Sequence, residues 1–232
     1  DNLKSLVTPR TKLMIVNSPN NPCGSVIPEP DLRRLAEIAI DNDIIVMADE
    51  IYKDMYYGDQ EHVSITKFPG MRERTVILDG FSKSYAMTGW RLGYGVFPDF
   101  LVEPVVRLMT NSVSCTSVFS QMAAIAALEG PQDSVGMMME EFTKRRDLIV
   151  AGLNSLPGIT CPEPKGAFYA FPNIKGTGLS SKEFAEKAMY EAGVALLAGT
   201  AFGSFGDGYI RISFANSQEN LQEAIERLRT IL

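Results

Sequence analysis

Lys83 is the residue of this chain whose surroundings best suit covalent chemistry. Ser82 precedes it, Arg91 follows eight residues later, and apolar runs at Val76–Leu78 and Leu92–Phe97 flank the segment. These runs predict strands, so Lys83 lies in a connection between strand ends, where α/β proteins carry their chemistry. A desolvated lysine near another cation loses its proton more readily and can attack an aldehyde. A hydroxyl and a guanidinium beside it could bind phosphate.

Two further polar segments follow apolar runs nearer the N-terminus. Leu13–Val16 leads into Asn17–Gly24, where two prolines and a glycine predict a sharp turn that presents the Asn21 amide in a defined direction. The next run, Ile44–Ala48, leads directly into Asp49. A carboxylate at the end of a buried strand is costly without a partner, so this position predicts a helix N-cap or a surface pair.

A helix is predicted between these two runs, from about Pro30 to Asn42, because apolar residues recur there at helical spacing. Strand, helix and strand in succession are typical of a parallel sheet. The carboxyl ends of parallel strands share one edge, so Asn21, Asp49, Tyr52 and Lys83 are expected to converge on one ligand.

An arginine occupies the middle of another predicted strand near the C-terminus. Residues Tyr209–Ala215 alternate, with Arg211 on the face opposite the two isoleucines. An arginine on a half-buried strand needs an anionic partner. The residues alone favour a structural salt bridge.

Taken together, these motifs resemble those of the class I and II pyridoxal-phosphate (PLP) aminotransferases, the aspartate and aromatic group of fold type I. The matching motifs are Asn-Pro-x-Gly at 21–24, Asp49 with Tyr52, Ser82-Lys83 with Arg91, and Arg-x-Ser-Phe at 211–214. The resemblance implies PLP as the cofactor. It also implies transfer of an amino group between an L-amino acid and a 2-oxo acid.

The resemblance assigns a role to each motif residue. Lys83 would hold PLP as a Schiff base and move the α-proton, while Asp49 would pair with the pyridine nitrogen. Tyr52 and Asn21 would bond the phenolic oxygen, Ser82 and Arg91 the phosphate, and Asn21 and Arg211 the substrate carboxylate.

Two positions depart from the family pattern. Cys23 stands where threonine is commonest, and Gly80 stands where a second serine is frequent. Phosphate binding would therefore depend more on Ser82, on Arg91 and on whatever precedes this chain.

The resemblance also implies the fold class and domain plan. We expect an α/β type I PLP-dependent transferase fold, with part of the large domain, mainly a parallel sheet with flanking helices, in residues 1–130. Residues 131–232 would hold an interdomain helix and a small α+β domain. Further expected helices lie at 99–108, 118–129, 134–153, 180–193 and 218–232, and further strands at 166–171 and 194–197. Since residues 1–12 lead directly into a strand, we expect the chain to lack an N-terminal part of the enzyme.

Composition excludes several classes of function. A net charge of −6 disfavours nucleic acid and anionic membranes as partners. No apolar run approaches the ~20 residues of a membrane span, and no signal-peptide pattern opens the chain. The three cysteines lack metal-site spacing, and His62 is the single histidine, so we expect no metal, reduced thiols and a cytoplasmic protein. The resemblance implies a homodimer.

Three alternatives remain open. A PLP-dependent lyase of the same fold would share every motif, and a catalytically incompetent structural or dimerising fragment is a second possibility. A Rossmann-type binding domain is disfavoured because no Gly-x-Gly-x-x-Gly opens a helix after a strand. The choice of amino acid and 2-oxo acid is open.

Overall fold

The computed structural model describes residues 2–59 and 61–232, which form two compact units. Unit 1 comprises Asp1–Pro19, Val26–Asp54 and Gln60–Val135, and unit 2 comprises Asn20–Ser25, Met55–Asp59 and Gly136–Leu232. Each unit is built from segments that are not contiguous in the chain. The domain limits at 1–130 and 131–232 stay a prediction.

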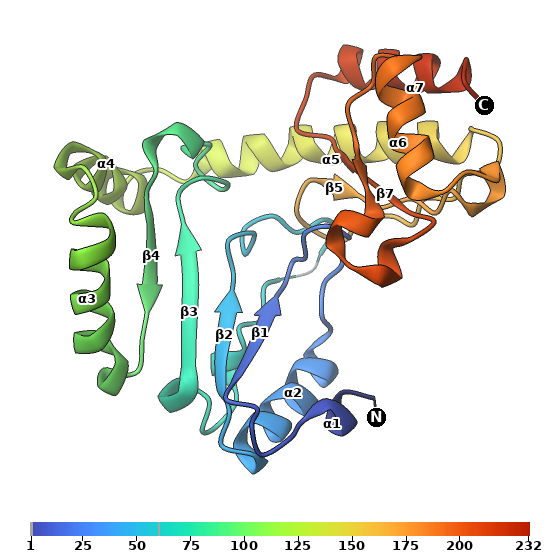
Figure 1. The fold of residues 1–232 in the computed structure, drawn as a ribbon. Coiled ribbons are helices and arrows are strands. Elements are labelled where there is room, and N and C mark those ends of the chain that lie inside the picture. The colour runs from blue at the N-terminus through green and yellow to red at the C-terminus, as the bar shows by residue number, and fades with distance from the viewer. Residues whose placement is uncertain (1, 60) are drawn as a thin grey trace. The chain divides into compact units, whose positions relative to one another are not determined.

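A four-stranded sheet in the order β1-β2-β3-β4 forms the centre of unit 1 (Figure 1). Its strands are β1 (Leu13–Asn17), β2 (Ile45–Asp49), β3 (Thr75–Gly80) and β4 (Gly93–Val96). The first three are parallel, as predicted, whereas β4 runs antiparallel to β3. The ends of β1, β2 and β3 therefore lie at one edge of the sheet.

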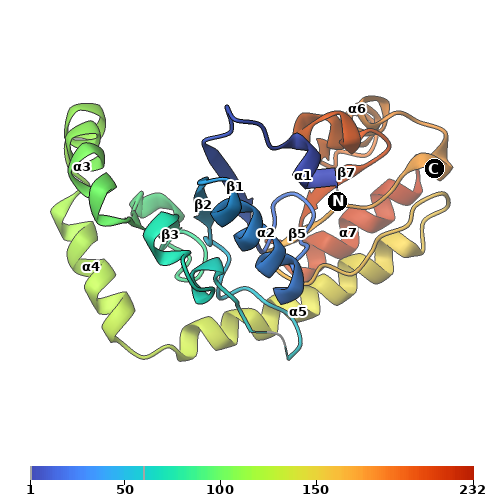
Figure 2. The same cartoon turned by 90° about the horizontal axis from the view of Figure 1, so that it is seen from below.

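Helix α2 (Glu29–Asp41) covers one face of β1 and β2 (Figure 2). Its apolar stripe of Leu32, Ala36 and Ala39 packs against Val16 and Val46 in the main core of unit 1. Pro30 lies within the first turn of the helix, where its missing amide costs nothing. A short helix, α1 (Asn2–Leu6), precedes β1.

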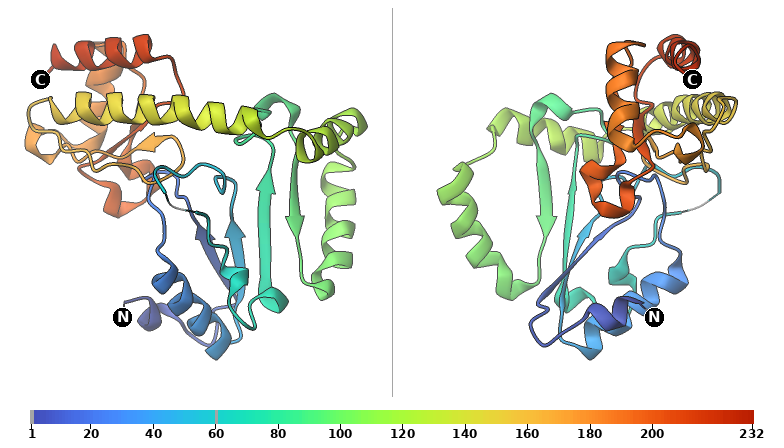
Figure 3. Two further views of the ribbon diagram at one scale, coloured as in Figure 1. Left: turned by 180° about the vertical axis from the view of Figure 1, so that it is seen from behind. Right: turned by 45° about the vertical axis from the view of Figure 1, so that its right-hand side comes forward.

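The segment after β4 is helical and poorly buried. Helices α3 (Asp99–Val113) and α4 (Val118–Glu129) follow β4 in the chain (Figure 3). Helix α3 has no buried residue, and α4 buries only Ser120 and Ala124. Ala124 joins Phe81 and Leu92 in a small second core. Helix α4 has the predicted bounds, whereas α3 continues five residues past its predicted end at 108.

Unit 2 combines an antiparallel sheet with three helices. The sheet order is β5-β7-β6, and the 22-residue helix α5 enters the unit at Gly136. The elements are α5 (Asp133–Asn154), β5 (Tyr169–Ala170), α6 (Ser181–Tyr190), β6 (Leu197–Ala198), β7 (Ile210–Ser213) and α7 (Gln218–Arg229). Stacked rings of Phe142 and Phe168, 5.7 Å apart, and the fully buried Phe214 form part of its core.

Two strand predictions in unit 2 were wrong in extent. The strand expected at 166–171 shrinks to β5, because Ala167 has a positive φ of 57° that breaks the extended conformation. The strand expected at 194–197 is displaced to Leu197–Ala198. The predicted capping box is present, with Ser180 and Glu183 bonding each other's backbone amides at the start of α6. That helix ends at Tyr190 instead of 193, and α7 ends at Arg229 instead of 232.

Within the described residues, none of the helices has the length and apolar character needed to cross a membrane.

Candidate active site

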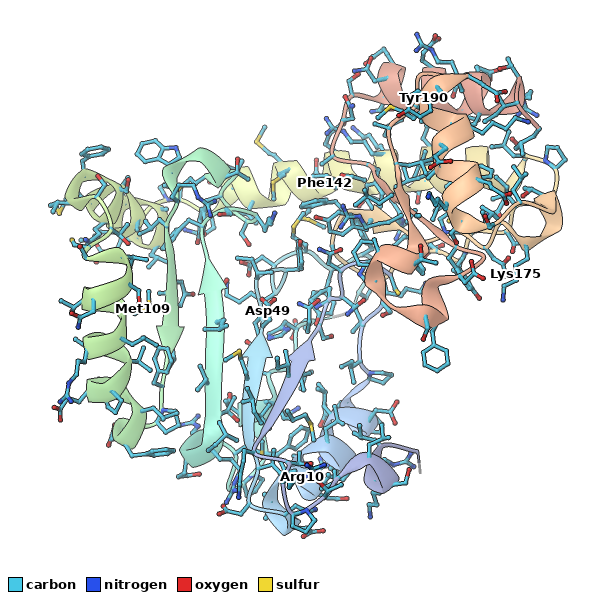
Figure 4. All side chains as sticks on the ribbon, in the orientation of Figure 1. Arg10, Asp49, Met109, Phe142, Lys175 and Tyr190 are labelled. Atoms are coloured by element: carbon cyan, nitrogen blue, oxygen red, sulfur yellow. The ribbon has the colours of Figure 1, made fainter. Side chains whose placement is uncertain are left out.

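Asp49 ends β2 at the edge of the sheet that the predicted site shares (Figure 4). Strand register pairs it with Asn17 on β1 and with Leu78 on β3. Asn17 Nδ2 donates to the carbonyl oxygen of Asp49 (3.1 Å), which ties the two strand ends together. This backbone anchor fixes the position from which the carboxylate projects.

The Asp49 carboxylate is half-buried, and its ionisation is disfavoured. Burial raises its pKa, a hydrogen bond from the Ile51 amide (3.3 Å) lowers it, and the negative charge of Asp79 raises it further. Two basic side chains of this region have other acidic partners: Lys53 pairs with Asp79, and His62 Nε2 lies 2.9 Å from Glu50. The ion pairs found in the described residues do not include Asp49. A protonated pyridine nitrogen would supply the missing cation, so this site fits the ring of PLP.

Lys83 lies in the turn that follows β3, as predicted. Its Nζ is 5.8 Å from the centroid of the Tyr52 ring, and that ring is buried. The turn is closed by hydrogen bonds from the Ala86 amide to the Lys83 carbonyl (3.1 Å) and from the Met87 amide to the Phe81 carbonyl (3.2 Å). The structure therefore brings the predicted amine and the predicted phenol together.

Arg91 and Ser82 lie on the same connection as Lys83. Arg91 adopts a left-handed backbone conformation with φ of 53°, and its exposed guanidinium donates to the Thr88 carbonyl (2.9 Å). Ser82 is half-buried, and the hydroxyl of Ser84, two residues on, is buried without a partner among the described residues. The role of Ser82 and Arg91 in holding phosphate stays a prediction.

A buried carboxylate beside this site was missed in the sequence. Asp79 accepts hydrogen bonds from the Tyr94 hydroxyl (2.5 Å) and the Gly80 amide (2.6 Å), and it forms an ion pair with Lys53 (3.3 Å). Burial and the bond to Asp79 raise the pKa of Tyr94 to about 12, so the phenol keeps the proton it donates. Tyr94 lies directly opposite Asp79 in the strand register, a pairing that neither residue reveals alone.

The predicted carboxylate site lies in unit 2. Arg211 Nη1 donates to Asn21 Oδ1 (2.9 Å), which joins residues 190 positions apart. Strand β7 alternates as predicted, with Ile210 and Ile212 buried and Arg211 half-buried on the other face. The Asn21 turn is anchored to unit 2 at Gly24, whose carbonyl accepts from the Lys165 amide (2.8 Å).

Gly24 is required at its place in this turn. It has a φ of +64°, and a Cβ there would lie 2.6 Å from the Tyr169 carbonyl oxygen and 2.7 Å from Pro164 Cβ. Both the backbone conformation and the close approach therefore demand glycine. Cys23, which replaces the more frequent threonine, is exposed, and its amide donates to Asn20 Oδ1 (3.2 Å).

Arg211 keeps a donor for a further ligand. Its Nε is buried and has no hydrogen-bond partner among the described residues. Its guanidinium carbon lies over the Tyr169 ring, 4.6 Å from the centroid, and over the Phe202 ring at 5.0 Å. A carboxylate would satisfy the buried donor, so this site fits the predicted partner. The two rings are a feature that the sequence did not reveal.

Cysteine, histidine and acidic side chains do not gather into a metal site in the described part of the chain: no cluster of three or more is present. The single histidine, His62, bonds the buried Glu50 through Nε2 (2.9 Å). Glu50 thus has a side-chain partner, whereas the carboxylate of its neighbour Asp49 accepts from a backbone amide, that of Ile51.

Comparison with known proteins places these motifs in one family. The family model described as aminotransferase class I and II matches residues 1–228. The chain is 45% identical over its whole length to the aspartate aminotransferase of Pyrococcus abyssi. It is 44% identical to the aromatic-amino-acid aminotransferase 2 of Thermococcus litoralis. A solved aromatic aminotransferase from Pyrococcus horikoshii matches with a TM-score of 0.96 and 43% identity over 100% of this chain.

These relatives are longer than this chain. It spans about 60% of the length of the two curated relatives and 62% of the solved structure.

Proposed function

Because this chain belongs to the class I and II aminotransferase family, we propose that the protein transfers an amino group between an L-amino acid and a 2-oxo acid. Its fold is the type I fold of PLP-dependent transferases, as predicted. Members of the family use PLP, which supplies an aldehyde for the amine and an electron sink for the carbanion that forms when the α-proton leaves.

The observation that carries this proposal is the arrangement at the ends of the parallel strands. Among the described residues the Asp49 carboxylate has no cationic partner, and Lys83 presents an amine over the Tyr52 ring, both within unit 1. PLP has a pyridine nitrogen that can pair with a carboxylate and an aldehyde that can react with an amine. Asp49 and Lys83 offer these two groups. A half-buried carboxylate without a compensating charge destabilises the fold, so it is not expected at a sheet edge whose role is purely structural.

Each side chain would have a defined task. Lys83 would bind the cofactor aldehyde through Nζ and, once displaced by the substrate amine, take the α-proton and return it. Asp49 would hold a proton on the pyridine nitrogen and so keep the ring electron-poor. Tyr52 and Asn21 would donate to the phenolic oxygen, and Ser82 and Arg91 would bind the phosphate.

Arg211 and Asn21 would hold the substrate. Arg211 would donate a hydrogen bond from its buried Nε to the α-carboxylate. Asn21 Oδ1 accepts from Nη1 at 2.9 Å and so would hold the guanidinium in position. A fixed carboxylate orients the bond from Cα to the α-proton for cleavage. The relatives are named for aspartate and for aromatic amino acids, so these are the substrates to test first.

The test of this proposal is site-specific attachment of PLP. The chain is mixed with PLP, its absorption is followed across a pH series, and borohydride then fixes the cofactor for peptide mapping. We expect a pH-dependent visible band and a label on Lys83. The variant Lys83→Ala should lose both, whereas Lys165→Ala, which removes an exposed lysine paired with Glu163, should keep them. A label spread over surface lysines would contradict the proposal for this chain.

A 2-oxo-acid acceptor assay separates the transferase from a lyase of the same fold. Only a transferase should convert the added 2-oxo acid into an amino acid in proportion to the donor consumed. Release of ammonia or a thiol without that conversion would favour the lyase. A chain that binds no PLP would favour the structural fragment.

We further propose a cytoplasmic homodimer. The described cysteines are free thiols, which suits a reducing compartment. Many apolar side chains on α3 and α4 are exposed, which suits a surface that another polypeptide covers.

A further inference from the structure

Two aromatic rings contact the guanidinium of Arg211. Its central carbon lies over the Tyr169 ring, 4.6 Å from the centroid, and over the Phe202 ring, 5.0 Å from the centroid. Both distances are within the range of a cation–π interaction. Tyr169, Phe202 and Arg211 all belong to unit 2.

The rings are themselves held in place. Phe202 ends a 3-10 turn (Gly199–Phe202) and packs edge-on against Phe171 with the ring centroids 6.2 Å apart. Phe171 in turn stacks on Tyr209 at 5.4 Å, two residues before the arginine. A row of aromatic side chains therefore links the Phe202 turn to the strand that carries Arg211.

The polar contacts of Arg211 indicate which of its nitrogens a ligand can reach. One terminal nitrogen donates to Asn21, and Nε is buried without a partner among the described residues. Each ring covers part of the flat surface of the guanidinium, so the open approach for ligand oxygens is to the nitrogens in its plane. A planar carboxylate can do this with two parallel bonds.

We propose that Tyr169 and Phe202 form an aromatic clamp that fixes the guanidinium plane and makes the site selective for planar carboxylates over tetrahedral oxyanions. This inference rests on the proposed role of Arg211 in binding the substrate carboxylate. A sulfonate or phosphonate places an oxygen out of the plane, where it meets a ring. The clamp residues are positioning residues, because they act through Arg211.

The experiment follows Arg211 directly, without cofactor or turnover. The Nε–H resonance of Arg211, assigned by its loss in Arg211→Lys, is monitored by NMR during titration with propionate and with ethanesulfonate. These monoanions carry similar tails and differ in the shape of the head group. We expect propionate to shift the resonance in a saturable way and to bind at least about tenfold more tightly than ethanesulfonate.

Phe202→Leu removes the ring and keeps an apolar side chain. It should weaken propionate binding about three- to tenfold and bring the ratio of the two affinities toward one. Phe205→Leu is the matched control, since Phe205 lies three residues later and is 99% exposed, and both affinities should stay unchanged. Phe202→Tyr should restore the wild-type ratio, and circular dichroism verifies that each variant is folded.

Equal affinities for the two anions in the wild-type chain, or an unchanged ratio in Phe202→Leu, would overturn the clamp. An absence of any propionate-dependent shift would overturn the carboxylate site as well. Failure of the proposed function looks different, because it is measured as missing PLP label on Lys83 in unit 1.

Discussion

Asp49 illustrates how a half-buried carboxylate can lower the stability of a fold. Burial and the charge of Asp79 raise its pKa in the folded chain above the usual value for aspartate. Such a group stabilises the fold fully only below its unfolded pKa, and that contribution is lost as pH rises through the folded pKa. At neutral pH the ionised carboxylate is therefore a cost.

The variant Asp49→Asn should consequently be more stable than the wild-type chain without cofactor at neutral pH. The gain should vanish at about pH 3, where the wild-type carboxylate is protonated. Thermal unfolding across a pH series measures it, and PLP labelling of Lys83 in the same variant should fall. The contrast is Glu50→Ala, which removes the side chain that contacts His62 Nε2 at 2.9 Å and should destabilise the chain. A destabilised Asp49→Asn at neutral pH would refute this account.

Lys53 has the opposite effect on stability from Asp49, because its positive charge compensates the buried carboxylate of Asp79. Burial alone would lower its pKa, but the bond to Asp54 and the charge of Asp79 outweigh burial and raise it. Lys53→Met would leave the Asp79 carboxylate with two neutral donors and should cost about 1–3 kcal/mol in urea unfolding. A raised lysine pKa means that the stabilisation persists until pH exceeds it, so the loss should be constant between about pH 6 and 9.

The control for Lys53 is an exposed lysine with an equally short contact. Lys67 bonds Glu29 at 2.9 Å, yet both side chains are more than one-third exposed. Lys67→Met should cost no more than about 1 kcal/mol. Equal losses in the two variants would show that the buried Asp79 has no special need of Lys53.

Residue identity and spacing pointed to one group of candidate site residues and not to another. Lys83, Asp49 and Arg211 follow or occupy apolar strands, where a charge is conspicuous in the sequence. Tyr94 and Phe202 could not be found in that way, because an aromatic residue in a sequence is as typical of a hydrophobic core as of a functional site. Their roles depend on a cross-strand partner and on a ring contact that only the folded chain specifies.

At the level of elements, periodicity predicted helices better than short strands. Helix α4 has its predicted bounds because its apolar run is closed by a glycine. Strand β5 has two residues instead of six, since the backbone at Ala167 turns to a positive φ and Gly166 pairs with Tyr56. An alternating pattern of apolar and polar residues does not reveal such a break in the backbone conformation.

Helix α5 offers two glycines with opposite expected effects. A Cβ at Gly136 meets nothing within 4 Å, whereas one at Gly152 would lie 2.6 Å from Ile225 on α7. Gly136→Ala should stabilise the chain by about 0.5–1 kcal/mol, because alanine loses less backbone entropy in a helix. Gly152→Ala should destabilise it by about 1–3 kcal/mol through overpacking.

Chemical denaturation of the two variants side by side measures both effects. Both variants replace glycine by alanine in the same helix, so the contribution of helix propensity to the change in stability cancels in the comparison. The remaining difference in stability reports the packing against α7. Two stabilised variants would show that α5 and α7 are less closely packed at Gly152 than the structure indicates.

The division of the whole molecule was beyond what composition could predict. Residues 20–25 and 55–59 lie in the N-terminal part of the chain and yet belong to unit 2. They join it through backbone bonds from Lys165 to Gly24 (2.8 Å) and from Ala167 to Met55 (2.9 Å). Such assignments arise from long-range pairing, whereas hydrophobic patterns are local.

Exposed apolar side chains on α3 and α4 dominate one part of unit 1. None of the residues of α3 is buried, and a groove of about 970 Å³ is lined by Trp90, Met109, Val113 and Phe119 among others. The exposed fractions include 63% for Leu108, 58% for Val113 and 76% for Phe119. A patch of this kind on a free surface promotes association.

The proposed homodimer therefore predicts concentration-dependent self-association through these helices. Sedimentation equilibrium of the chain should show a dimer, and Leu108→Glu with Phe119→Glu should shift it toward monomer by about tenfold or more in dissociation constant, because two charges would be buried in the contact. Tyr190→Glu is the control, since Tyr190 is 85% exposed on α6 in unit 2 and should leave the equilibrium unchanged. A wild-type chain that stays monomeric, or a dimer indifferent to both glutamates, would exclude α3 and α4 as the dimer surface.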